Sequence, residues 1–115
     1  MLEDVSISAL HAALRGLSAR QKAVSDDIAN VNTPYFTARR VAFEGDLKRA
    51  LANGEDPMSV SPSVSFSSAA PGLSGNNVDL DAETVSSLDT QMRYELALRA
   101  TGDRFTLYRT AIKGA

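Results

Sequence analysis

The segment Ser6–Pro34, SISALHAALRGLSARQKAVSDDIANVNTP, predicts how the chain folds at its start. Its apolar residues recur at alternating steps of three and four, and Gln21 fills one position of that series. The members of the series are Ile7, Leu10, Leu14, Leu17, Val24, Ile28 and Val31. Such a heptad series predicts an α-helix over residues 6–31 with one face of the coiled-coil type.

The end of this helix is predicted by the sequence Asn32-Thr33-Pro34. Asn tolerates the left-handed conformation that closes a helix, and a proline disfavours the helical conformation of the residue before it. Gly16 lies inside the helix, where it costs about 1 kcal/mol relative to Ala. The glycine is either tolerated there or needed for the close approach of a neighbour, and the sequence leaves both readings open.

A second long helix is predicted over residues 79–113. Asp79, Asp81 and Glu83 stand at its start, where negative charge suits the helix dipole, and Lys113 stands at its end. Its apolar residues form two stripes, and Thr101 fills an open position of the second. The first stripe is Val85, Leu88, Met92 and Leu96, and the second is Tyr94, Leu98, Phe105, Tyr108 and Ile112. Together they are broader than one antiparallel partner covers, so we expect more than one neighbour.

Residues 32–78 are predicted to form an irregular, partly disordered middle arm. We expect extended chain over 35–41 and a short helix over 43–52. From Met58 to Ser67 apolar residues alternate with serines, and Pro62 suits an edge strand or a bend. The predicted fold is therefore mainly α and a single domain over residues 1–115. Its two long terminal helices pair as a coiled-coil-like hairpin, and the arm carries a short helix and some β-structure.

Composition excludes several classes of function. The 115 residues carry a net charge of −2, which does not suit a nucleic-acid binder, and the densest basic spot, Arg39-Arg40, reads as a solvated loop edge. The chain has no Cys, and no apolar run approaches the roughly 20 residues that cross a bilayer. The acidic N-terminus lacks the features of a secretory signal. We therefore expect no transmembrane segment and no cleaved signal peptide.

Residues that could carry chemistry are few. His11 is the only histidine, so a small hydrolase would have to recruit it from a helix surface. The acids after Asn77 alternate as in a calcium loop, but Ala82 and Leu88 stand where that loop needs Gly and Glu. The acids are better explained as helix-start residues. We expect no catalytic residues, no metal, no cofactor and no small-molecule substrate.

Two stretches resemble a known family. Asp27–Pro34, DIANVNTP, closely resembles the N-terminal signature of flagellar rod and hook proteins, and Asn76–Asp81, NNVDLD, is similar to the start of their C-terminal helix. The ending Arg109–Ile112, RTAI, and the placement of Tyr94 look most like a proximal rod protein of the basal body. The residues that match the family motifs are Asn30, Asn32, Thr33, Pro34, Asn77, Val78, Asp79, Leu80 and Asp81. In one departure, Tyr35 follows Pro34 where the family commonly has Gly, and a side chain disfavours a positive φ there.

The resemblance implies a structural subunit without enzymatic activity. Such proteins leave the cytoplasm through the flagellar type III export apparatus without a cleaved signal, and they assemble in the periplasmic rod of the basal body. Their terminal helices line the rod's inner tube, which surrounds the export channel, and the rod transmits motor torque. The implied partners are other rod subunits, an adaptor at the basal-body ring and copies of the chain itself.

We expect the heptad face of the first helix to pack on the last helix, and the remaining apolar face to pack on neighbouring subunits. The residues expected at these interfaces are Leu10, Leu14, Leu17, Val24, Ile28, Leu88, Met92, Tyr94, Leu98, Phe105, Tyr108 and Ile112. Three alternatives remain open from the sequence. They are another axial rod or hook protein, a helical adaptor or chaperone of flagellar export, and the small hydrolase that would use His11.

Overall fold

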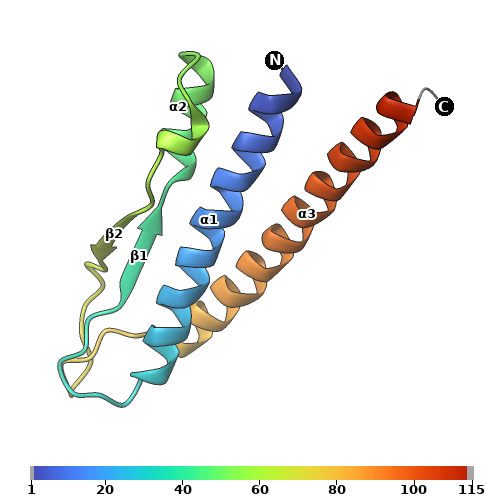
Figure 1. Ribbon diagram of the computed structural model, residues 1–115. Helices are drawn as coiled ribbons and strands as arrows, with labels where there is room; N and C mark the ends of the chain where they lie inside the picture. Colours follow the sequence, from blue (N-terminus) through green and yellow to red (C-terminus); the bar gives the residue numbers. More distant parts are fainter. Residues whose placement is uncertain (1, 114–115) are drawn as a thin grey trace.

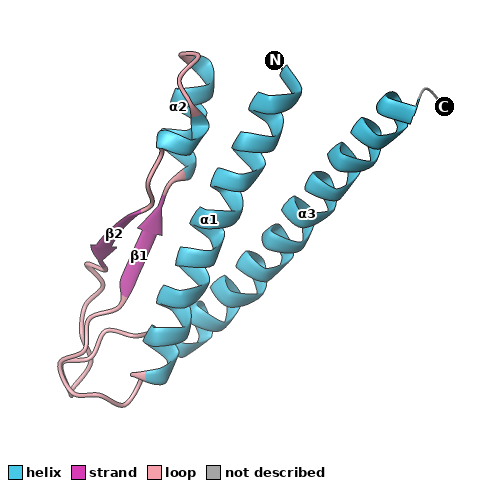
Figure 2. Ribbon diagram, in the orientation of Figure 1, coloured by secondary structure: helices cyan, strands magenta, loops and turns pink. Residues whose placement is uncertain are grey.

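The computed structural model describes residues 2–113 and is mainly helical, as predicted (Figures 1 and 2). Two long helices bound a middle arm that contains one short helix, one 3-10 turn and two strands. In chain order the elements are α1 (Leu2–Ala29), β1 (Arg39–Ala42), α2 (Glu44–Ala52), η1 (Pro57–Ser59), β2 (Ser63–Phe66) and α3 (Leu80–Lys113). The predicted bounds of the terminal helices, 6–31 and 79–113, therefore differ from the observed ones by at most four residues.

The molecule is elongated rather than globular. Its principal extents are 64 × 27 × 14 Å, and its radius of gyration is 17.7 Å. A compact domain of this length has a radius of gyration of about 13 Å. Figure 1 shows the reason: α1 and α3 run antiparallel, and the arm folds back along the other side of α1. The two long helices are close together where α3 begins and diverge towards the end where α3 terminates.

Small side chains explain the close end of the hairpin. Thr90 of α3 is 1% exposed, and Ser87 accepts a hydrogen bond from Gln21 Nε2 of α1 at 3.0 Å. One helical turn further along the same side of α3 comes Tyr94, which packs against the core. Short side chains let two helices approach, and bulky ones separate them. The predicted hairpin is confirmed, but small polar residues rather than either apolar stripe line its tightest part.

The core lies between α1 and the arm. Its buried members are Leu17 and Ala23 of α1, Val41 of β1, and Phe43. The ring of Phe43 lies on Gly16, so close that a Cβ on this glycine would stand 2.4 Å from the ring. This settles the two readings of Gly16, because the close approach is made by the chain's own arm.

Replacing Gly16 by Ala is therefore expected to destabilise the subunit, although Ala is the better helix former. Overpacking costs about 1–3 kcal/mol and outweighs a propensity gain of about 1 kcal/mol. Gly102→Ala is the matched control, because nothing lies within 4 Å of a Cβ built at Gly102 of α3. Urea unfolding of the two variants should give shifts of opposite sign. A stabilised Gly16→Ala variant would contradict the close packing of Phe43.

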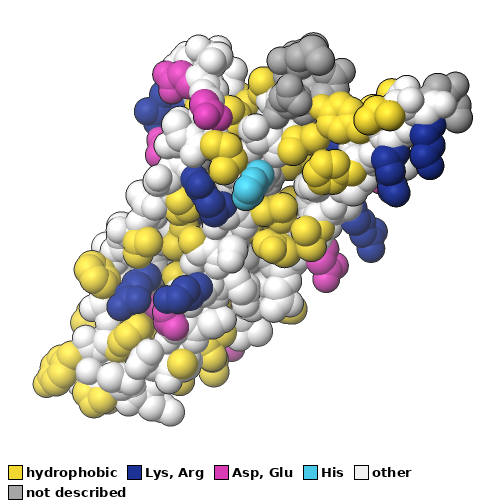
Figure 3. All heavy atoms as spheres, viewed as in Figure 1, with side chains coloured by type: hydrophobic (Ala, Val, Ile, Leu, Met, Phe, Trp, Pro, Cys, Tyr) yellow, Lys and Arg dark blue, Asp and Glu magenta, His cyan; other side chains and the backbone are white. Residues whose placement is uncertain are grey.

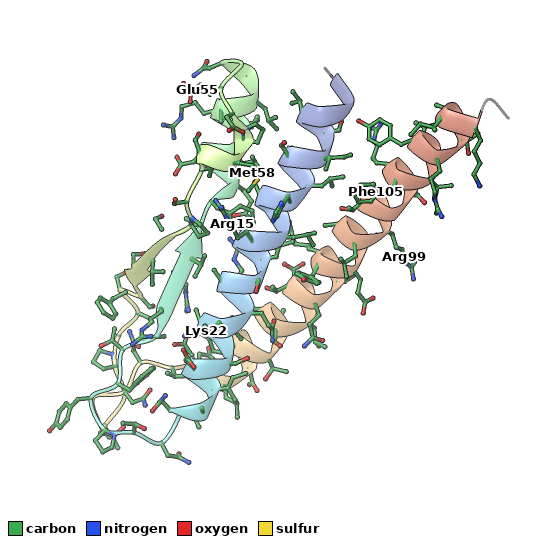
Figure 4. All side chains as sticks on the ribbon, viewed as in Figure 1. Arg15, Lys22, Glu55, Met58, Arg99 and Phe105 are labelled. Carbon is green, nitrogen blue, oxygen red and sulfur yellow. The ribbon has the colours of Figure 1, made fainter. Side chains whose placement is uncertain are left out.

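Arginines of α1 hold the arm in place. Arg20 donates to both oxygens of Glu44 at 2.6 Å and to Val41 O at 2.7 Å, and its guanidinium lies 5.1 Å from the centre of the Phe43 ring. Arg15 reaches η1 by donating to the carbonyl oxygens of Met58 and Val60, and Figure 4 shows Arg15 on the side of α1 that faces the arm.

The two strands form a single antiparallel ladder in the described chain. Its register pairs Arg39 with Phe66 and Ala42 with Ser63, and β2 is exposed along its whole length. Pro62 comes directly before β2, which fits the prediction of an edge strand.

Candidate functional site

The two stretches that resemble flagellar rod and hook proteins, residues 27–34 and 76–81, meet in space at the end of the hairpin where α1 and α3 are close together. Asn76 is 8% exposed, and its Nδ2 donates to the carbonyl oxygens of Asn30 and Thr33, both at 2.8 Å. Its Oδ1 accepts from the backbone N–H of Val78 at 2.7 Å. One buried side chain therefore joins the turn after α1 to the segment that leads into α3.

Asn77 extends this network into the arm. Its Oδ1 accepts from the backbone N–H of Ala38 at 2.7 Å, and its Nδ2 donates to the carbonyl oxygens of Ser67 and Ala69, both at 3.2 Å. We call the turn Asn30–Pro34 together with Asn76 and Asn77 the motif clasp. Since buried polar groups need partners, these amides fix the position of the turn between the helices.

The turn itself is stabilised locally. Asn30 Nδ2 donates to Asp26 O at 2.8 Å, and Thr33 Oγ1 donates to Asn30 Oδ1 at 3.0 Å. Asn32 was predicted to suit the left-handed conformation, but among the described residues the non-glycine with a positive φ is Tyr35, at 63°. That conformation costs an ordinary side chain about 1–2 kcal/mol. The turn thus keeps a left-handed residue at the position where the family commonly has Gly.

Contacts to the turn at Ser74 and Gly75, before α3, compensate for this strain. The backbone N–H of Tyr35 donates to Ser74 O at 3.1 Å. The ring of Tyr35 lies over Gly75, where a Cβ would come within 2.4 Å of it. Gly75 has a φ of 78°, so both the space and the backbone require glycine there.

The start of α3 is capped as the sequence predicts. Asp79 Oδ1 accepts from the backbone N–H groups of Asp81 and Ala82 at 3.1 and 3.2 Å. These bonds satisfy donors that have no partner within the helix. Glu83 differs from the other acids, because it is 1% exposed rather than solvated.

Beside the clasp, Asp27 of α1, Arg40 of β1 and Glu83 of α3 form a cluster that the sequence did not reveal. Asp27 is 0% exposed, and both its oxygens accept from the backbone N–H of Arg39, at 3.1 and 3.2 Å. Arg40 Nη1 lies 2.8 Å from Glu83 Oε1 and 3.7 Å from Asp27 Oδ2. The predicted solvated loop edge at Arg39-Arg40 is corrected in part: the two side chains are 42% and 48% exposed, but they belong to strand β1, and Arg40 partly neutralises two buried carboxyl groups.

We call the two buried acids of this cluster, Asp27 and Glu83, the acid pair. Arg40 contacts both of them, and Glu83 Oε2 has no hydrogen-bond partner among the described residues. Burial away from water raises the pKa of Asp27 to about 6 from the ordinary value of 3.8. The N–H of Arg39 opposes that shift, and the neighbouring Glu83 carboxyl adds to it. A proton on Asp27 would supply a donor beside the unpartnered carboxylate.

The raised pKa of Asp27 makes the stability depend on pH. Between about pH 4 and pH 6 the folded chain holds a proton that the unfolded chain has lost. The stabilisation is therefore complete below about pH 4 and is lost as the pH rises through 6. The full shift corresponds to on the order of 3 kcal/mol. Glu44 affects stability in a separate and lower pH range. Its hydrogen bonds to Arg20 hold its pKa at about 2. The stabilisation by the Glu44 carboxylate is therefore lost only as the pH falls below about 4.

Asp27→Asn is expected to raise the free energy of unfolding at pH 7.5 by about 1–3 kcal/mol and to flatten its decline between pH 5 and 7.5. The amide keeps an acceptor for Arg39 N–H and offers a donor towards Glu83. Urea unfolding at several pH values measures the slope, with Asp26→Asn as the control on the adjacent, 41% exposed carboxylate. An unchanged slope in Asp27→Asn would show that Asp27 is not the group responsible.

The residues expected at interfaces fall into three groups by exposure. Leu17 and Val24 are buried inside the chain at 5% and 4% exposure, and five others are half-buried: Leu10, Leu14, Ile28, Tyr94 and Tyr108. The remaining five are exposed: Leu88, Met92, Leu98, Phe105 and Ile112. Figure 3 shows apolar side chains gathered along the diverging ends of α1 and α3.

The exposed residues of α3 lie on two sides of the helix. Val85, Leu88, Met92 and Leu96 are each 60–67% exposed, and we call them the outer stripe. Their spacing puts them opposite Thr90 and Tyr94, which face α1. Figure 4 shows the same division further along, with Phe105 towards α1 and Arg99 on the other side. Nothing in the described chain covers the outer stripe.

His11 lies exposed on α1, where it is the cyan side chain of Figure 3. Among the described residues it forms no hydrogen bond or ion pair with a hydroxyl or carboxyl group. The geometry therefore offers no support for the hydrolase alternative.

Comparison with known proteins decides the family. No protein-family model matches the chain. The flagellar basal body rod protein FlgB of Borrelia hermsii is 32% identical to it over 132 aligned positions, which cover 96% of this chain and 97% of the relative. The chain belongs to the FlgB family. FlgB of Salmonella typhimurium is 27% identical over 96% of this chain, and FlgB of Escherichia coli K12 is 27% identical over 84%.

Membership of the FlgB family confirms the resemblance predicted from the two motifs and identifies a structural protein of the flagellar basal body rod. No helix among residues 2–113 has the length and apolar character needed to span a bilayer. The two stretches that carried the resemblance supply the residues of the clasp, and the hydrogen bonds of Asn30, Asn76 and Asn77 give these asparagines a structural role in this chain. The buried acid pair was not predicted, although one signal existed: Asp27 follows Val24 by three residues and so lies beside the heptad face.

Proposed function

We propose that this chain is a structural, non-enzymatic subunit of the periplasmic part of the flagellar rod, where it transmits torque and lines the export channel. It reaches the rod through the flagellar type III apparatus without a cleaved signal. Its partners there are copies of itself, other rod subunits and the adaptor at the basal-body ring. The relationship to FlgB proteins over nearly the whole chain supports the rod assignment.

The outer stripe is the observation that supports assembly through α3. Four large apolar side chains stand in a row on a 34-residue helix and are at least 60% exposed. A contiguous exposed apolar surface of this kind marks an interaction site. Assembly would bury it, and at about 25 cal/mol per Å² it would contribute several kcal/mol to each contact.

Met92→Asp tests this proposal in a strain that lacks the chromosomal gene. The expected result is loss of swimming and of rods, because a carboxylate at the centre of an apolar contact remains desolvated and unpaired. Ser65→Ala, on the exposed strand β2, is the control and should restore swimming fully. Normal swimming with Met92→Asp, together with failure of Ser65→Ala, would contradict assembly through α3.

A further inference from the structure

An open apolar groove lies where α1, α2 and α3 come together. It has a volume of about 390 Å³, and its apolar lining is Ala13, Leu17, Phe43, Leu47, Leu51 and Ala97. Leu17 and Phe43 belong to the buried core, whereas Leu51 at the edge is 42% exposed. The groove is therefore an exposed extension of the core.

The outer stripe has the spacing of a helix that docks into such a groove. Val85, Leu88, Met92 and Leu96 stand at positions i, i+3, i+7 and i+11, which place one side chain per turn on a single face. The stripe points away from α1, whereas the groove is lined by residues of α1, α2 and α3 itself. The two surfaces therefore cannot meet within one copy.

Charges favour contact between copies. Lys48 lines the groove and has no ion pair among the described residues, whereas Glu44, on the same groove, is neutralised by Arg20. Asp81 and Glu95 flank the outer stripe and are likewise unpaired in the part of the chain that the structure describes. The free ammonium beside the groove and the free carboxylates beside the stripe are complementary in sign. Of the other cations nearby, Arg93 on the groove is paired with Asp89, and Arg99 follows Leu96 by three residues, beyond the end of the stripe.

We propose that the outer stripe of α3 in one copy occupies the α1–α2–α3 groove of a second copy. This proposal rests on the proposed function and names one contact within it. The contact is heterologous, since it joins different surfaces of the two copies, and each copy still presents a free stripe at one side and a free groove at the other. Contacts of this type propagate into helical arrays unless the rotation closes a ring.

Crosslinking in assembled rods tests the contact, because the chain has no Cys of its own. Cells without the native gene would express Met92→Cys and Leu51→Cys copies together, and purified basal bodies would be treated with a short bifunctional maleimide. The expected product is a dimer of the two variants, found in the mixture and absent with either variant alone. Met92→Cys mixed with Ser65→Cys is the control and should give no dimer.

A second experiment decides the case in which a cysteine variant fails to assemble. Lys48→Glu is expected to reduce swimming, and adding Glu95→Lys to the same chain should restore most of it, because every copy then carries both reversed charges. Normal rods with no Met92–Leu51 dimer, or a Met92 crosslink to a different protein, would overturn the proposal and leave the rod assignment intact. Rods that form without this chain would instead refute the proposed function.

Discussion

Replacing Leu17 by Asp is expected to unfold the subunit. Leu17 is 5% exposed and packs in the core between α1 and the arm. A carboxylate there loses its hydration without gaining a partner, and the lost apolar burial adds to that cost. The destabilisation should exceed about 4 kcal/mol, a large part of the roughly 5–15 kcal/mol that holds a domain together.

Circular dichroism and urea unfolding of the purified full chain measure this effect. Ser18→Asp is the matched control, because it adds the same charge to the exposed position next along α1. It should change stability by no more than about 0.5 kcal/mol. A Leu17→Asp chain with native helix content and an unchanged unfolding midpoint would show that the contact between α1 and the arm is not the core.

The second large effect is expected at the clasp. Asn76→Ala removes two hydrogen bonds to the carbonyls of Asn30 and Thr33 and leaves the N–H of Val78 without its acceptor. The expected loss is about 2–3 kcal/mol, because buried groups that lose a partner keep their desolvation penalty. The turn after α1 should also loosen, so its amides should exchange faster with solvent than in the unmodified chain.

Hydrogen exchange and urea unfolding check both parts of that expectation. Asn32→Ala is the control, since Asn32 belongs to the same turn but is exposed and forms no side-chain hydrogen bond in the described structure. Equal effects of the two substitutions would mean that the clasp depends on the turn sequence in general and not on the buried amide of Asn76.

The helices were predictable from sequence because their signals are local. The heptad series from Ile7 to Val31 and the capping residue Asp79 each act within a few residues, and the observed helices follow them. The short helix and the edge strand of the arm were also predicted, from Phe43 to Ala52 and from the alternation around Val64.

What the sequence did not reveal depends on contacts between distant segments. Asp27, Arg40 and Glu83 come together only when the chain has folded, and nothing in Arg39-Arg40 distinguishes a solvated pair from one that neutralises buried acids. The packing of Phe43 over Gly16 likewise joins residues that are far apart in the sequence. Tyr35 is a different case, since its positive φ opposes the local preference and is maintained by its contacts with Ser74 and Gly75.

The central claim is that the chain is a subunit of the flagellar rod. The most direct test deletes the gene in its native bacterium and images purified basal bodies by electron microscopy, with the same strain carrying the gene on a plasmid as the control. The account predicts rings without a rod and cells that do not swim, with both defects reversed by the plasmid. Intact rods and normal swimming in the deletion strain would contradict it and would favour an adaptor or chaperone of flagellar export.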